Sequence, residues 1–165
     1  MNLCEHNAKI TQIFHKALYW KVAAFGTLCI QQEYQVYVQL AKNRFFDMST
    51  HLKKTVNRFW RAVTTGYAID DKYLLIIEES EFEPRDAWEE MALQIVQDIQ
   101  DLYYAVWKKD AQATLKAAKQ QFVLLEKYCA LLGEEFIEEH PMVKCAMEQQ
   151  TNWAKELVAV SKQDK

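Results

Sequence analysis

Residues 84–109 read PRDAWEEMALQIVQDIQDLYYAVWKK, and this segment shows the helical character of the chain most clearly. Its apolar side chains recur every three or four positions, which is the spacing of one face of an α-helix. Acidic residues stand near its start, where the positive end of a helix favours them, and Lys108 and Lys109 stand at the opposite end. We therefore predict a helix over Pro84–Lys109. The stripe expected to face the core is Trp88, Met91, Ala92, Ile95, Val96, Ile99, Leu102, Tyr103 and Val106.

Helical spacing extends over most of the remaining chain. Further helices are expected at about 8–16, 18–41, 49–63, 110–132 and 141–160, and the first two of these can form one long helix. Ser49 and Asp110 suit the N-terminal cap of a helix, whereas Gly66 and Gly133 suit its end. The apolar run Leu74–Ile77 is too short for periodicity to separate a buried strand from a short helix.

The composition supports a single helical domain. The chain has 165 residues, of which 50% are hydrophobic and 26% charged, with 3 Gly and 2 Pro. So little Gly and Pro is unsuited to an all-β fold with frequent turns. No repeat or linker divides the sequence. We predict an all-α, single-domain bundle of six or seven helices that spans residues 1–165.

No feature of the sequence points to secretion or to a membrane. The net charge of -3 gives no overall attraction to nucleic acids or anionic membranes. The longest mainly apolar stretch, residues 17–30, contains Lys21 and is shorter than the roughly 18–20 residues that a membrane span needs. The first residues, MNLCEH, lack the basic and apolar segments of a secretory signal. We expect a cytoplasmic protein whose four cysteines are reduced.

Aromatic and apolar residues follow a characteristic spacing, first between Leu18 and Val63 and again near the end of the chain. The positions are Trp20, Phe25, Leu28-Cys29-Ile30, Tyr34, Tyr37, Phe59-Trp60, and the Pro141–Val160 segment with Trp153. In these features the chain resembles the YjaG-like family of bacterial proteins, a domain-of-unknown-function family. The resemblance implies a compact multi-helical fold and a bacterial source. It implies no activity, because none is assigned to the family.

The chain also contains five tryptophans, which could line a ligand pocket. Trp20, Trp60, Trp88, Trp107 and Trp153 all fall at positions that suit the core or its edge. Large rings supply much of the buried area that a domain of this size needs. We therefore interpret the tryptophans as core residues.

Common catalytic and metal-binding motifs are absent from the sequence. Di-iron helix bundles use Glu-x-x-His, but the residues three positions before the four histidines are Leu3, Gln12, Met48 and Ile137. The patterns HExxH, CxxC and GxSxG and a glycine-rich phosphate loop are also missing. We expect no catalytic residues, no cofactor and no bound metal. An unrecognised enzyme or small-molecule binder remains an alternative.

One group of side chains could still ligate a metal ion. Glu135, Glu138, Glu139 and His140 bring carboxylate and imidazole groups together immediately before Pro141. Acidic runs of this kind are usually solvated. We interpret this group as an acidic loop or helix start.

A basic face is expected on the helix that begins near Ser49. Lys54, Arg58 and Arg61 lie opposite the apolar line of this helix. Such a row could contact phosphates, so a nucleic-acid-associated protein that uses the helix 50–63 is one functional alternative. No glycine-rich segment or exposed aromatic partner accompanies the row. An ordinary solvated face is therefore preferred, and nucleic-acid binding is not the leading expectation.

The predicted helix 84–109 also carries a second face without charge. This row consists of Leu93, Gln97, Gln100 and Tyr104, although charged residues flank it. Uncharged surfaces of this kind are usually covered, here either by another helix of the same chain or by a homodimer or partner interface. We expect a non-catalytic protein that acts through protein–protein interaction or self-association.

Overall fold

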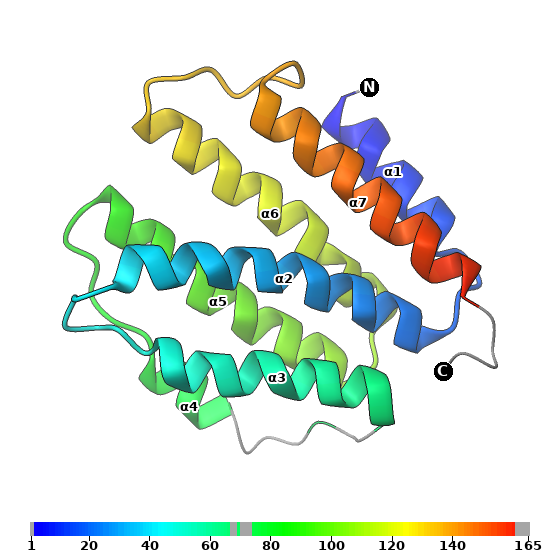
Figure 1. Ribbon diagram of the computed structural model, residues 1–165, viewed down its shortest axis with the longest axis horizontal. Coiled ribbons are helices and arrows are strands. Elements are labelled where there is room, and N and C mark those ends of the chain that lie inside the picture. The colour runs from blue at the N-terminus through cyan, green and yellow to red at the C-terminus, as the bar shows by residue number, and fades with distance from the viewer. Residues whose placement is uncertain (1, 67–68, 70–73, 161–165) are drawn as a thin grey trace.

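The computed structural model describes residues 2–66, 69 and 74–160, and all regular secondary structure in these residues is α-helical (Figure 1). The predicted all-α bundle is therefore confirmed. The run 74–77 belongs to a short helix, so the strand alternative is wrong. The helices are α1 (Leu3–Ile13), α2 (Tyr19–Ala41), α3 (Ser49–Thr65), α4 (Leu74–Glu79), α5 (Ala87–Trp107), α6 (Ala111–Leu131) and α7 (Pro141–Ala159).

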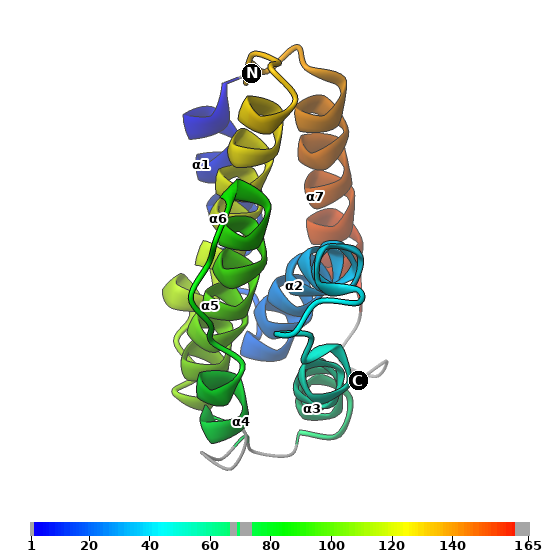
Figure 2. The ribbon, with the colours of Figure 1, turned by 90° about the vertical axis from the view of Figure 1, so that its left-hand side faces the viewer.

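The helices form two layers, which Figure 2 shows edge-on. One layer contains α7, α2 and α3, and the other contains α1, α6, α5 and α4. Helix α2 is central, because it packs against α3, α5, α6 and α7. The main core lies between the layers, where Phe25 and Tyr37 of α2 and Ile95 and Tyr103 of α5 are fully buried. The predicted inner stripe of the 84–109 segment thus faces the core.

Helix ends follow local capping. Helix α5 begins at Ala87, later than the predicted Pro84, because the side chain of Asp86 accepts a hydrogen bond from the Glu89 amide at 2.8 Å. Asp110 caps α6 as predicted and accepts from the Ala113 amide at 3.0 Å. Gly66, with φ of 72°, ends α3 as predicted.

The first helix differs most from the prediction. It begins at Leu3 because Asn2 and Glu5 form a reciprocal capping box, and it ends at Ile13. The chain then turns through Lys16, whose φ of 67° lies in the left-handed region, so α1 and α2 are separate helices. This break lets α1 pack beside α7 (Figure 1).

Close packing around α2 depends on Gly26. A Cβ atom at this position would lie 3.0 Å from Thr114 Cγ2 of α6 and 3.1 Å from Leu102 Cδ1 of α5. The absence of a side chain therefore lets α2 approach both helices of the opposite layer.

Four of the five tryptophans agree with the predicted position in the core or at its edge, and one does not. Trp107 is 42% exposed, which contradicts its predicted core position, and the other four are half-buried at the edge of the core. Trp60 also uses its ring N–H, which donates to Gln31 Oε1 at 3.0 Å. The polar end of an indole needs such a partner or water, which explains the position of Trp60 at the core edge.

In the described part of the chain, every helix falls short of the length or the hydropathy needed to cross a membrane. All four cysteines are free; Cys29 and Cys129 are buried, and Cys4 and Cys145 are exposed.

Candidate functional site

Helix α2 has an inverted charge pattern. Its only charged residues are Lys21 and Glu33, and both are buried. Its exposed positions are instead uncharged, with Gln32, Gln35, Val36 and Gln39 facing solvent. An amphipathic surface helix normally shows the opposite arrangement, with its charges outside. The outer side of α2 is therefore an uncharged surface, which is unusual for a solvent-exposed helix.

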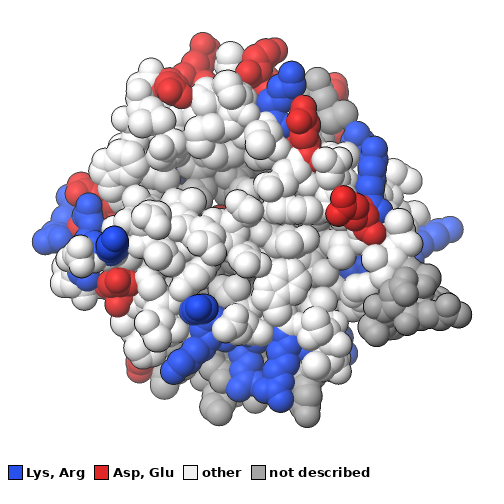
Figure 3. All heavy atoms as spheres, viewed as in Figure 1, with Lys and Arg blue, Asp and Glu red and all other residues white. Residues whose placement is uncertain are grey.

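This surface continues onto α6 and α7 and contains a groove. Figure 3 shows a broad uncharged area with a hollow, at the place where α2 and α6 lie side by side in Figure 1. The groove has a volume of about 410 Å³. Its lining residues are Gln32, Glu33 and Val36 of α2, Gln121, Leu124 and Leu125 of α6, and Pro141, Met142, Cys145, Ala146 and Gln149 at the start of α7. Most of this lining is apolar or amide-bearing.

Glu33 is the exceptional residue of the groove. It is the one acidic or basic residue that lines it within the described chain, and it is only 1% exposed. Neither of its carboxyl oxygens receives a hydrogen bond from an N–H group of the described residues. A buried carboxyl group without such donors is costly for stability, so it is uncommon unless the group has a function.

The neighbour of Glu33 is a second carboxyl group, that of Asp98 on α5. Burial raises the pKa of Glu33 well above its usual value, and the neighbouring carboxyl group of Asp98 raises it further. Burial also raises the pKa of Asp98. Both shifts make it harder for Glu33 and Asp98 to be ionised together. Oδ1 of Asp98 accepts a hydrogen bond from Gln94 Nε2 at 2.7 Å, whereas its Oδ2 has no hydrogen-bond partner among the described residues.

Two other buried charged residues have hydrogen-bond partners that account for their burial, and these partners indicate a structural role. Lys21 donates to the Val158 carbonyl at 2.9 Å and so binds the C-terminal end of α7. Glu89 accepts hydrogen bonds from Arg44 at 2.8 Å and from Arg85 at 2.9 Å. The Arg85 hydrogen bond is the main reason that the pKa of Glu89 falls to about 2. Glu33 has no comparable partner.

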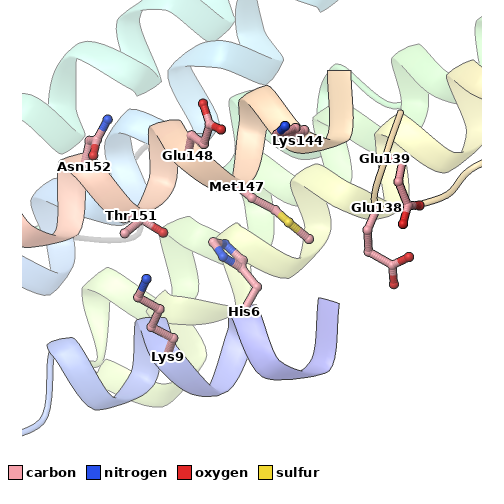
Figure 4. Close-up of a pocket in the computed structure, with 9 residues that line it drawn as sticks. All are labelled: His6, Lys9, Glu138, Glu139, Lys144, Met147, Glu148, Thr151 and Asn152. Carbon is pink, nitrogen blue, oxygen red and sulfur yellow. The ribbon is translucent and has the colours of Figure 1, made fainter. Parts of the chain in front are cut away.

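A second cavity, of about 600 Å³, lies between α1 and α7 (Figure 4). His6 points from α1 toward Met147 of α7, while Glu138 and Glu139 lie on the loop that precedes α7. Burial lowers the pKa of His6, so its ring is neutral near pH 7. Both acidic and basic side chains line this cavity, unlike the groove.

A chain of buried polar side chains connects the two cavities. His6 Nε2 lies 2.9 Å from Gln150 Oε1 and donates to it. Gln150 Nε2 in turn donates to Gln121 Oε1 at 2.7 Å. Gln121 belongs to the groove and His6 to the second cavity. The chain fixes the position of α7 over α6 and thereby the width of the groove.

The row predicted on the outer face of α5 lies at the surface. Gln97 and Tyr104 are exposed, and Leu93 and Gln100 are half-buried. Two of the four residues are thus partly covered within the chain, and the alternatives of intrachain cover and of a partner interface both stay predictions. The row does not contribute to the groove.

The predicted basic row lies on the outside of α3. Lys54 and Arg61 are exposed, and Arg58 is half-buried. Figure 3 shows Lys and Arg side chains along the α3 edge of this view, away from the groove. Contact with phosphates stays a prediction.

The sequence reasoning missed the groove, although one signal for it was visible. The 23 residues of α2 contain only two charges in a chain that is 26% charged. So few charged residues are expected in a helix that is buried on all sides or covered by a partner. The pairing of Glu33 with Asp98 had no signal in the sequence.

Comparisons of the chain with protein-family models, curated proteins and solved structures gave no match. The resemblance to the YjaG-like family and the bacterial source that it implies therefore stay predictions.

Proposed function

We propose that this protein is a non-catalytic interaction protein whose groove between α2, α6 and α7 binds an apolar segment of a partner protein, with a lysine of that segment directed at Glu33. The observation that carries the proposal is the buried carboxyl group of Glu33, which lines an otherwise uncharged groove and lacks N–H donors. A lysine ammonium group supplies such donors and a complementary charge.

The shape and chemistry of the groove favour a lysine-bearing segment. Val36, Leu125 and Met142 would pack against the methylene chain of the lysine, as apolar surfaces commonly do. The uncharged surface extends beyond the groove along the exposed glutamines of α2. A protein segment can cover this wider surface, whereas a free amine cannot. The centres of protein–protein interfaces typically contain few charged residues.

Binding of lysine-centred peptides to the groove is the first test. The probes are a library of apolar peptides with one fixed lysine and a matched library in which norleucine replaces it. We expect binders only from the lysine library, and Glu33→Gln should lower their affinity roughly 10-fold or more, because the charge pair is lost. Fluorescence polarisation measures the affinity. The methyl resonance of Met142 should shift on binding, while that of Met48, which lies outside the groove, should not.

A matched control is Glu126→Gln, which makes the same change at an exposed position of α6 outside the groove. This variant should bind the lysine peptides as tightly as the wild type. Equal binding of the norleucine peptides, or an unchanged affinity for Glu33→Gln, would contradict the proposal.

Self-association through α5 is a second candidate function, favoured by the surface position of its uncharged row. Two copies can meet on this row without opposing like charges. We expect the combined change Leu93→Glu and Tyr104→Glu to convert a dimer into a folded monomer, because the introduced carboxylates would repel each other. Light scattering measures the mass, and thermal unfolding tests the fold. A monomeric wild type, or a variant that no longer folds, would contradict this interface.

A further inference from the structure

Three potential metal ligands meet where α6 ends and α7 begins. They are Cys129 in the last turn of α6, Glu134 in the following loop and His140 immediately before α7. The Cys129 Sγ, a carboxylate oxygen of Glu134 and a ring nitrogen of His140 all lie within 4.8 Å of one another. The loop residue Glu135 does not belong to this group, so the structure selects a different set from the acidic run seen in the sequence.

We propose that Cys129, Glu134 and His140 form a binding site for a zinc ion. Sulfur, nitrogen and oxygen ligands of this kind suit zinc, and ligands of a tetrahedral zinc ion lie about 3.3–3.9 Å apart. The three ligand atoms are therefore near this spacing, although His140 and Glu134, which are in direct hydrogen-bond contact, must separate to admit the ion. Three protein ligands would leave a fourth position for water. The Glu134 side chain is 47% exposed, so water reaches this place.

The surroundings favour a cation at this place. The carbonyl end of α6 lies here and carries partial negative charge. Glu135, Glu138 and Glu139 lie on the same loop and add to the negative potential. A zinc ion here would tie the end of α6 to the start of α7, which also forms one side of the groove.

The proton of the His140 ring must change from one nitrogen to the other when zinc binds. In the structure, His140 Nδ1 accepts from the Met142 amide at 3.1 Å, so the ring proton is on Nε2 and is donated to Glu134. Zinc takes the place of this proton at Nε2, the ring takes up a proton on Nδ1, and water binds the Met142 amide. The Cys129 thiol releases its proton as it ligates the metal. The balance is one proton released for each zinc ion.

The experiment is a titration of the full-length protein with Zn²⁺ and, as a spectroscopic probe, Co²⁺. Cys4 and Cys145 are exposed and could bind metal elsewhere, so the parent protein carries Cys4→Ser and Cys145→Ser. We expect this parent to bind one ion, to show a thiolate-to-cobalt charge-transfer band and to melt at a higher temperature with Zn²⁺. Cys129→Ala and His140→Asn should each lower the affinity roughly 100-fold or more and remove the thermal shift.

The variants distinguish a zinc site formed by Cys129, Glu134 and His140 from nonspecific binding of the metal to the acidic loop. His140→Asn keeps a side chain that can cap α7, and Glu134→Gln keeps a hydrogen-bond acceptor, so both should fold without metal. The combined change Glu138→Gln and Glu139→Gln should leave one-ion binding intact, within about threefold. Absence of the thiolate band in the parent, or Cys129→Ala binding as tightly as the parent, would overturn the proposal. Equal loss of binding in the Glu138/Glu139 variant would also overturn it.

Discussion

Replacing Phe59 with Ala is expected to lower the free energy of unfolding by about 3–5 kcal/mol, the usual cost of removing a fully buried aromatic ring. Phe59 is 0% exposed and lies on the inner side of α3. Its ring meets Tyr103 of α5 edge-on, with the centroids 5.8 Å apart. The ring thus joins the two layers of the fold, and the cavity left by Ala would lie between helices that cannot close on it without moving α3. Urea denaturation measures the loss.

Phe45→Ala is the matched control, since it removes the same side chain from the loop between α2 and α3. Phe45 is 71% exposed and contacts Arg85 and Phe46. Its loss should cost less than about 1 kcal/mol. Trp60→Ala should fall between the two, because Trp60 is half-buried. A cost below about 1 kcal/mol for Phe59→Ala would contradict the packing of α3 against α5.

Glu33→Gln is expected to act in the opposite direction and stabilise the protein by about 1–3 kcal/mol at pH 8, the usual cost of a buried polar group without its partner. The pKa of Glu33 is higher in the folded than in the unfolded chain. The folded state therefore holds a proton that the unfolded state loses above its ordinary pKa of 4.5. By linkage, wild-type stability falls as the pH rises from that value toward the folded-state pKa. The amide of Gln does not titrate, so Glu33→Gln removes this dependence on pH.

Urea denaturation at pH 5 and pH 8 checks this expectation. The gain from Glu33→Gln should be larger at pH 8, and Glu126→Gln, exposed on α6, should show no gain at either pH. A variant less stable than the wild type at pH 8 would show that Glu33 is structurally satisfied. If the variant gains stability and loses peptide affinity, then Glu33 lowers the stability of the protein and contributes to binding, as binding-site residues commonly do.

Local signals were sufficient for most helices. The apolar spacing placed the stripes of α3 and α5, and Asp110 and Gly66 marked a start and an end as predicted. These features act over one or two turns, so neighbouring residues decide them. The capping box of Asn2 and Glu5 acts over the same range. It places the start of α1 at Leu3, earlier than the predicted start near residue 8.

The candidate sites depend on packing between helices that are distant in the sequence. Glu33 meets Asp98 because Gly26 lets α2 approach α5, and the cost of burying both carboxyl groups exists only after that contact forms. The exposure of Gln97 and Tyr104 on α5 likewise depended on where the other helices packed. Apolar periodicity therefore determined which residues form helices and which sides turn inward, since it follows from burying one side of each helix. Which polar groups meet was decided by the tertiary structure, because desolvation and charge pairing act through space and leave no periodic pattern along the chain.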